Sequence, residues 1–215
     1  MKKGLTELVF ILDRSGSMAG LESDTIGGFN SVLEKQKKEE GRANITTILF
    51  DDQYEMLHEC CNLQKVGRIT EKEYFVRGTT ALLDAVGKTI SRMIHVQRRG
   101  ARQERAEKVM FVIITDGMEN ASVEYSYQQI NKMIEHQKKN YDWEFIFLGA
   151  NIDAQEVAGR FGIAKERAAN YHGDSEGTRL NYGVISDTVS QLREKGSIAG
   201  DWKEKIDQDY EKRNK

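Results

Sequence analysis

The chain has 215 residues, a length typical of one domain and sufficient to bury a large core. Its 32 basic and 34 acidic residues give a net charge of −2, so the composition gives no reason to expect binding to nucleic acid or to an anionic membrane. No segment approaches the roughly 20 apolar residues of a membrane helix, and the two cysteines, Cys60 and Cys61, are adjacent and poorly placed for a disulfide, so we expect a soluble cytoplasmic protein.

Short apolar segments alternate with amphipathic segments along the chain. The expected strands are LTELVFIL (5–12), ANITTILF (43–50), EKVMFVIIT (107–115), DWEFIFLGA (142–150) and a short edge strand, AANYH (168–172). The expected helices are 24–40, 81–96, 127–139, 153–161 and 178–192. In FDDQYEMLHECC, the polar turn 51–53 predicts a hairpin and therefore one antiparallel strand. The pattern predicts an α/β fold with a mainly parallel sheet, because several strands are nearly continuous Val, Ile, Leu and Phe.

The C-terminal part of the sequence is polar and charged. We expect a domain over residues 1–194 and a polar tail over residues 195–215. The evident apolar anchors of this tail are Ile198, Trp202 and Ile206. A segment of this composition is expected to dock weakly or to fray.

Three oxygen-rich loops fall at predicted strand ends or helix starts. DRSGSM follows the first strand, GTT precedes the helix that begins at residue 81, and TDGMEN follows the strand that ends at residue 115. In open α/β sheets, ligands bind outside the carboxyl ends of the strands. The oxygen-bearing side chains that these loops offer are Asp13, Ser15, Ser17, Thr79, Thr80 and Asp116.

The donor set consists of hydroxyls and carboxylates. Such hard oxygen ligands favour Mg²⁺ or Mn²⁺ over Zn²⁺. Two carboxylates roughly offset the charge of the ion, whereas neutral hydroxyl ligands leave it electron-poor. A further carboxylate from another molecule would then bind strongly, so the chemistry indicates a metal that recruits an acidic partner.

The segments DRSGSM, GTTALLDA and IITDGMEN resemble, in order and spacing, the three segments of the metal-ion-dependent adhesion site in von Willebrand factor type A domains. The resemblance covers about residues 5–192. It implies a doubly wound, Rossmann-like three-layer sandwich with helices on both faces of the sheet. It also implies a complete set of metal-site residues, which are Asp13, Ser15, Ser17, Thr80 and Asp116.

The resemblance assigns a role to each motif position. Ser15 and Ser17 resemble direct metal ligands, and Asp13 resembles an acceptor for metal-bound water. Thr80 matches the family's threonine, which places Thr79 at the preceding position, usually a small residue. The sequence departs from the family at 77–79, where paired glycines are common, and at Ala81, where proline often follows; these differences alter loop stiffness and remove no ligand.

Four further residues are expected at the rim of this site. Arg14 lies inside the first loop and is expected to attract an acidic partner, and Thr79 lies next to Thr80. Asp84 follows Thr80 by one helical turn and either braces the metal loop or acts as a solvated or capping carboxylate. Glu119, together with Asn120 beside it, either reaches the rim or belongs to a simple turn.

The resemblance implies a binding module that is not an enzyme. It would be a scaffold or regulator of the stand-alone bacterial or phage type, which captures an Asp or Glu of another protein through Mg²⁺ or Mn²⁺. One alternative is a metal-dependent hydrolase acting on phosphoesters, for which the sequence shows no clear general base or second metal. Another is homotypic assembly, in which a carboxylate of the tail around Asp207 and Asp209 occupies the site of a second copy.

Overall fold

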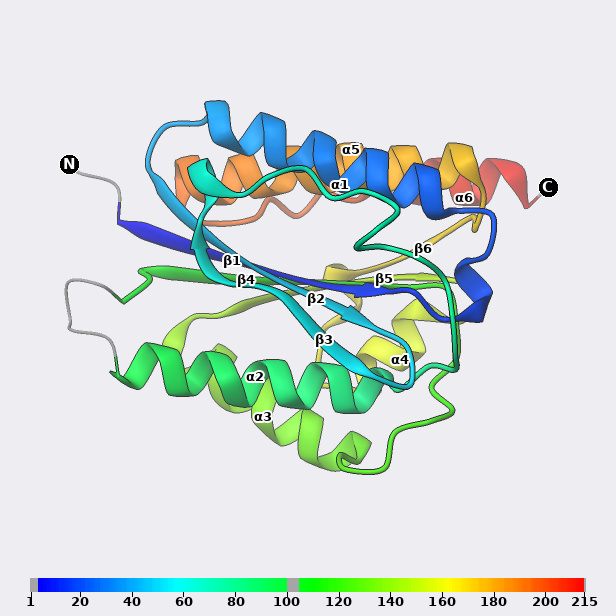
Figure 1. Ribbon diagram of the computed structural model, residues 1–215, viewed down its shortest axis with the longest axis horizontal. Helices are drawn as coiled ribbons and strands as arrows, with labels where there is room; N and C mark the ends of the chain where they lie inside the picture. The colour runs from blue at the N-terminus through cyan, green and yellow to red at the C-terminus, as the bar shows by residue number, and fades with distance from the viewer. Residues whose placement is uncertain (1–3, 100–104, 215) are drawn as a thin grey trace.

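The computed structural model describes residues 4–99 and 105–214 and has three layers, with one β-sheet between two layers of helices (Figure 1). The described sheet has six strands in the order β3-β2-β1-β4-β5-β6. They are β1 (Leu5–Asp13), β2 (Arg42–Phe50), β3 (Tyr54–Asn62), β4 (Lys108–Thr115), β5 (Glu144–Ala150) and β6 (Ala168–Tyr171). Strand β3 is antiparallel to β2, and the other described pairs are parallel. The predicted α/β fold, with a mainly parallel sheet and one antiparallel strand, is confirmed.

Helices cover both faces of the sheet (Figure 1). One layer contains α1 (Glu22–Lys38), α5 (Ser175–Lys195) and α6 (Glu204–Arg213). The opposite layer contains α2 (Leu82–Arg99), α3 (Tyr127–Tyr141) and α4 (Ala154–Arg160). Short 3₁₀ turns occur at η1 (Gly16–Met18), η2 (Leu63–Lys65) and η3 (Lys165–Arg167).

Strand β1 is buried on both faces, which explains its nearly continuous apolar sequence. Successive side chains of a strand point to opposite faces, so Phe10 and Ile11 enter different cores. Phe10 packs edge-on against Phe29 of α1 with 5.3 Å between ring centroids, whereas Ile11 belongs to the core that contains Ile90 of α2. This two-sided packing makes β1 a firmly held support for the loop that follows it.

Side-chain caps set several helix starts in this chain, whose sequence contains no proline. Asp174 accepts a hydrogen bond from the Gly177 backbone N–H at 2.9 Å, so α5 begins at Ser175 rather than at the predicted residue 178. Ser126 and Gln129 form a reciprocal capping box at the start of α3.

The segment after Lys195 packs against the rest of the structure. Helix α6 contacts α5 and β6. The side chains of Ile198, Trp202 and Ile206 are all buried, and Trp202 Nε1 donates to the Glu166 carbonyl oxygen at 2.8 Å. The division of the chain at residue 194 remains a prediction.

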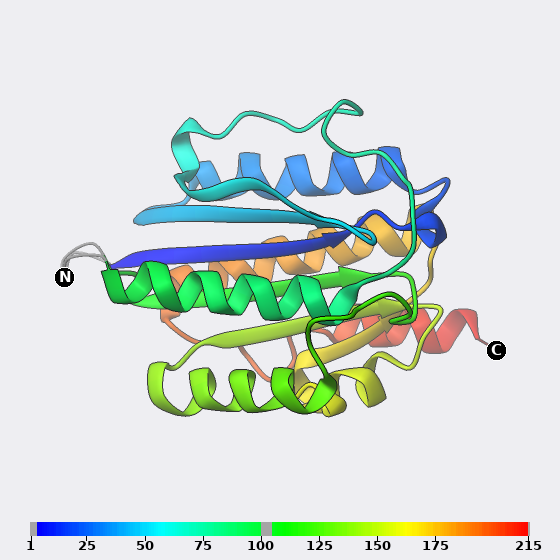
Figure 2. The same ribbon diagram turned by 60° about the horizontal axis from the view of Figure 1, so that its bottom comes forward.

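The order of the strands reverses direction at β1 and β4, which are neighbours in the sheet but not in the sequence. At such a point the connections leave the two strands toward opposite sides, and a crevice forms at their carboxyl ends. The loops that follow β1 and β4 and the loop that leads into α2 all lie at this end of the molecule, as does the C-terminal end of α6 (Figure 2). The fold therefore brings the three oxygen-rich loops to one edge of the sheet.

Candidate metal centre

The predicted metal-site residues lie where three chain segments meet at the carboxyl edge of the sheet. Asp13 is the last residue of β1, and Ser15 and Ser17 follow it around η1. Thr80 precedes α2, and Asp116 directly follows β4. The chain positions of all five therefore match a shared site.

Three hydroxyl oxygens form the centre of this arrangement. Thr80 Oγ1 donates to Ser15 Oγ at 2.9 Å, and Ser15 Oγ lies 3.1 Å from Ser17 Oγ. Ser15 and Thr80 are buried, whereas Ser17 is exposed. The hydroxyl cluster is therefore buried at Ser15 and Thr80 and open to solvent at Ser17.

Glycine closes one side of the hydroxyl cluster. A Cβ atom at Gly117 would lie 2.9 Å from Ser17 Oγ and 3.0 Å from Thr80 Oγ1. Both distances are below the 3.4 Å at which ordinary van der Waals contact begins. The absence of a side chain at this position keeps the space next to the hydroxyls open.

The Asp13 carboxylate is fixed beneath the hydroxyls. Its Oδ1 accepts the Ser15 backbone N–H at 2.7 Å, and its Oδ2 accepts the Thr115 hydroxyl at 2.6 Å. Burial raises the pKa of Asp13, and the hydrogen bonds from Ser15 and Thr115 oppose this rise. The carboxylate is thus held in one orientation, at an electrostatic cost that a nearby cation would reduce.

The Asp116 carboxylate is likewise buried and has a raised pKa. Burial, together with the negative charge of Asp13, raises the pKa of Asp116 to about 6, and a hydrogen bond from Asn151 opposes the rise. Asn151 adopts a φ of 54°, a left-handed conformation in which asparagine is enriched. Two buried carboxylates whose pKa values are both raised, next to three hydroxyls, form a site that favours positive charge.

This donor set fits a divalent ion of the Mg²⁺ class. Octahedral ligands at about 2.1 Å from an ion have neighbouring oxygens about 3.0 Å apart. The two hydroxyl separations of 2.9 and 3.1 Å agree with this spacing. The donors are hydroxyl and carboxylate oxygens, which are hard ligands of the kind that Mg²⁺ and Mn²⁺ prefer. Within residues 4–99 and 105–214, no group of three or more His, Cys, Asp or Glu side chains is placed to hold a metal.

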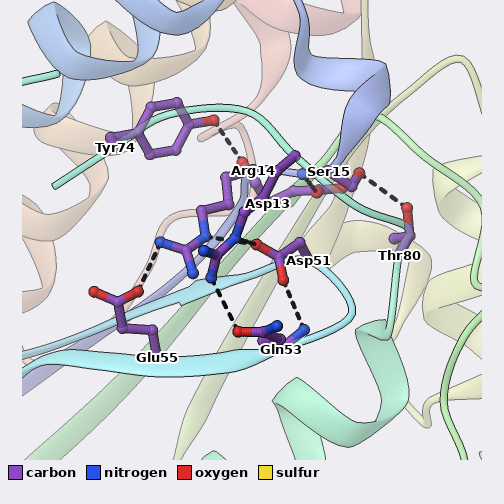
Figure 3. A network of polar contacts seen from close by, with 9 residues as sticks. Asp13, Arg14, Ser15, Asp51, Gln53, Glu55, Tyr74 and Thr80 are labelled. Atoms are coloured by element: carbon purple, nitrogen blue, oxygen red, sulfur yellow. Dashed lines mark hydrogen bonds and ion pairs between the residues drawn. The ribbon is translucent and has the colours of Figure 1, made fainter. Parts of the chain in front are cut away.

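Arg14 is placed differently from the prediction that it attracts an acidic partner. Its side chain is fully buried, with Nε donating to Asp51 Oδ2 at 2.8 Å and Nη1 lying 2.8 Å from Glu55 Oε2 (Figure 3). The charge of Arg14 is therefore compensated inside the protein and is not offered to another molecule. Thr79, in contrast, is exposed next to Thr80 as expected for a rim residue.

Asp84 and Glu119 stabilise the loop between β4 and α3. Asp84 accepts the backbone N–H groups of Val123, Glu124 and Tyr125 at 2.9–3.0 Å. Glu119 accepts the Leu83 N–H at 2.8 Å and so fixes the start of α2 to the loop that carries Asp116. Asp84 was expected either to brace the metal loop or to act as a solvated or capping carboxylate. Its contacts are those of a brace, but the loop that it stabilises is 122–125.

Sequence reasoning missed three residues that complete the surroundings of the site: Asp51, Thr115 and Asn151. It named Asn120, with Glu119, as a residue that either reaches the rim or belongs to a simple turn. Asn120 holds the Thr80 loop, because its Oδ1 accepts the Thr80 N–H at 2.9 Å and its own N–H donates to the Thr80 carbonyl oxygen at 3.0 Å. Asp51 and Asn151 each directly follow a predicted strand. The rule that ligands bind at the carboxyl ends of the strands could therefore have identified them.

A cavity of about 570 Å³ lies next to the site. Its lining includes Met118 and Asn151 from the metal face and His172 and Tyr210 from the neighbouring β6 end and α6. Met118, two residues beyond Asp116, is 72% exposed. A larger cavity, of about 870 Å³, lies between α1 and α5, and none of the five predicted metal-site residues lines it.

No protein-family model and no curated protein matches the sequence. Solved structures do match the fold. The von Willebrand factor type A protein from Catenulispora acidiphila superposes with a TM-score of 0.60 at 12% identity, covering 87% of this chain and 43% of that one. Manganese-loaded TRAP protein from Plasmodium vivax gives 0.59 at 17% identity, with coverage of 84% and 73%.

Proximal thread matrix protein 1 from the mussel byssus, whose structure has a zinc-occupied metal-ion-dependent adhesion site motif, gives a TM-score of 0.58 at 13% identity, with coverage of 87% and 46%. The chain thus spans less than half of two of these three proteins. At these identities the matches show the fold alone, and this chain has the fold of von Willebrand factor type A domains. No described helix is long and apolar enough to cross a membrane.

Proposed function

We propose that this protein binds Mg²⁺ or Mn²⁺ at Ser15, Ser17 and Thr80, with Asp13 and Asp116 completing the site, and that it uses the ion to capture an Asp or Glu of another protein. The observation that carries the proposal is the convergence of three hydroxyl oxygens, with separations of 2.9 and 3.1 Å, on the edge of the sheet that also holds the buried carboxylates of Asp13 and Asp116. Two proteins of the same fold, TRAP and the byssus protein, carry manganese and zinc in their structures.

The five proposed site residues have different roles in metal and partner binding. Ser15 and Thr80 are buried, and the exposed Ser17 leaves the solvent side accessible to a partner. The bound ion would supply the positive charge that attracts a carboxylate. Asp13 and Asp116 keep fixed orientations through Thr115 and Asn151.

Binding is favoured over catalysis because the neighbouring acidic side chains are already used. Asp84 and Glu119 each accept several backbone hydrogen bonds and so are not free to act as a general base. The exposed Met118 adds an apolar contact for a partner beside the metal face. We therefore propose a scaffold or regulator and not an enzyme, and a cytoplasmic location in agreement with its two free cysteines.

The proposal is tested in two steps with purified protein. Calorimetric titration with Mn²⁺ is expected to show one site in the wild type and none in Asp116→Ala. Partners retained on the immobilised protein in Mg²⁺ are expected to be released by EDTA and to be absent from Asp116→Ala. Asp187→Ala, which removes an exposed aspartate paired with Lys35 on the α1–α5 surface, is the matched control and should behave as wild type. Equal retention of partners by wild type and Asp116→Ala would refute capture through the metal.

A further inference from the structure

The turn between β2 and β3 forms a base under the two loops that carry the hydroxyls. Asp51, the first residue of this turn, has a fully buried side chain. Its Oδ2 accepts the Nε–H of Arg14 at 2.8 Å, and its Oδ1 accepts the Gln53 N–H at 2.6 Å (Figure 3). The same Oδ2 also accepts the Nε–H of Arg77 at 2.7 Å. Arg14 lies within the loop of Ser15, and Arg77 lies three residues before Thr80.

Backbone hydrogen bonds also connect the Ser15 loop, the Thr80 loop and the β2–β3 turn. The Asp51 carbonyl oxygen accepts the Ala81 N–H at 2.8 Å, directly after Thr80. The Arg77 N–H donates to the Arg14 carbonyl oxygen at 2.9 Å, and the Gly16 N–H donates to the Gly78 carbonyl oxygen at 3.1 Å. The loop of Ser15 and the loop of Thr80 are therefore joined to each other, and both are joined to Asp51.

Gly78 shows how closely this turn supports the second loop. It has a φ of 67°, and a Cβ atom there would lie 2.0 Å from Asp52 Oδ1. The backbone of the Thr80 loop at Gly78 thus lies directly against the side chains of Asp51 and Asp52 in the β2–β3 turn. The separation of Ser15 Oγ and Thr80 Oγ1 follows from this contact, because each loop is fixed to the same turn.

We propose that Asp51 and Arg77 are positioning residues for the metal site, which set the spacing of the Ser15 and Thr80 hydroxyls although neither residue provides a metal ligand. The inference rests on the metal-binding function proposed above. Outer residues that orient metal ligands typically change metal affinity by about 10- to 100-fold when they are replaced. The pair acts in the same way here, through Arg14 on one side and Ala81 on the other.

Arg77 provides a cleaner test than Asp51. Asp51 is the buried partner of Arg14, and its loss would leave that buried charge paired only with the partly exposed Glu55, which threatens folding. The Arg77 side chain is 38% exposed, and its removal leaves the Arg14–Asp51 pair intact. The direction of the effect also separates two explanations, because removing a positive charge near a cation site by itself strengthens cation binding, whereas loss of positioning weakens it.

The experiment compares Mn²⁺ affinity, measured by calorimetry with the metal alone, for wild type, Arg77→Gln, Arg77→Lys and Arg68→Gln. Arg68→Gln removes the same charge from an exposed arginine earlier in the same connection and serves as the control. Melting temperatures in EDTA verify that each variant is folded. We expect Arg77→Gln to bind Mn²⁺ about tenfold more weakly than wild type, Arg77→Lys to recover part of this loss, and Arg68→Gln to match wild type.

Two outcomes would overturn the inference, and they are distinguishable. Wild-type affinity or tighter binding in Arg77→Gln, with normal Mn²⁺ binding by the wild type, overturns the positioning role and leaves the proposed metal site standing. Absence of Mn²⁺ binding by the wild type overturns both.

Discussion

Replacing Gly117 by alanine tests the shape of the proposed metal site with one added methyl group. Gly117 is not in the left-handed region of φ, so alanine fits the backbone and the perturbation comes from the side chain alone. The new Cβ would lie 2.9 Å from Ser17 Oγ and 3.0 Å from Thr80 Oγ1, which is short of ordinary contact by about 0.5 and 0.4 Å. Each hydroxyl must move away from the new methyl group by about this amount.

Such a movement is large for a metal site and small for the fold. Ligand distances in metal sites are typically held to within about 0.2 Å, so we expect the Mn²⁺ affinity of Gly117→Ala to fall at least about tenfold. The exposed Ser17 can shift into solvent, so the melting temperature in EDTA should change little.

Isothermal titration with Mn²⁺ measures the effect, and Gly27→Ala provides the control. A Cβ at Gly27 of α1 meets no atom within 4 Å, so this variant carries the same chemical change without a clash. It should bind Mn²⁺ as wild type does, and alanine in a helix should raise the free energy of unfolding by about 0.5–1 kcal/mol. Unchanged Mn²⁺ affinity in Gly117→Ala would refute the placement of the ion among the three hydroxyls.

Three further predictions concern pH, stability and partner binding. Because the pKa of Asp116 is raised to about 6 and the metal requires its ionised form, Mn²⁺ affinity should fall about tenfold for each pH unit below 6, as measured by titration at several pH values. Burial raises the pKa of Glu7 from 4.5 to about 7, so the folded state holds this proton more tightly than the unfolded state. The free energy of unfolding should therefore fall by up to about 3 kcal/mol between pH 4.5 and 7 in wild type, and Glu7→Gln should remove that part of the slope in urea unfolding. Met118→Gln should leave Mn²⁺ affinity unchanged and weaken retention of partners, since it alters only the apolar surface beside the metal.

Each of these has a contradicting result. Mn²⁺ affinity that is constant from pH 7 to 5 would contradict the participation of Asp116. A Glu7→Gln variant with the same pH slope as wild type would show that other groups cause it. Retention of partners by Met118→Gln at the wild-type level would exclude this side chain from the interface.

The sequence carried the information for the fold and for the proposed ligands because both depend on local patterns. The apolar run before Asp13 predicts a buried strand, and a buried strand that ends in oxygen-bearing residues places them at the carboxyl edge of the sheet. The same holds for Asp116 after β4. These conclusions require the order of the elements and no knowledge of distant contacts.

The role of Arg14 could not be predicted in this way. Its place between Asp13 and Ser15 indicates a position at the site, but its burial depends on Asp51 and Glu55, which lie 37 and 41 residues further along the chain. An arginine is normally exposed unless it is paired, and the pairing is a property of the tertiary structure. The hairpin turn was predicted, yet the position of its carboxylate beneath two other loops was not.

Asp84 illustrates a smaller failure of the same kind. Its place on the first turn of a helix is compatible with capping, bracing or exposure, and sequence reasoning kept these alternatives open. The structure adds residues 123–125, whose backbone N–H groups converge on this carboxylate. A convergence of donors from nearly 40 residues away cannot be read from helical periodicity.

The most direct test of the central claim is the position of Mn²⁺ in crystals of the wild-type protein, located by anomalous scattering. We expect one strong peak at bonding distance from the hydroxyl oxygens of Ser15, Ser17 and Thr80, with a coordination position on the solvent side held by water or by a carboxylate of a neighbouring molecule. A peak at another location, or none at the three hydroxyls under saturating Mn²⁺, would contradict it.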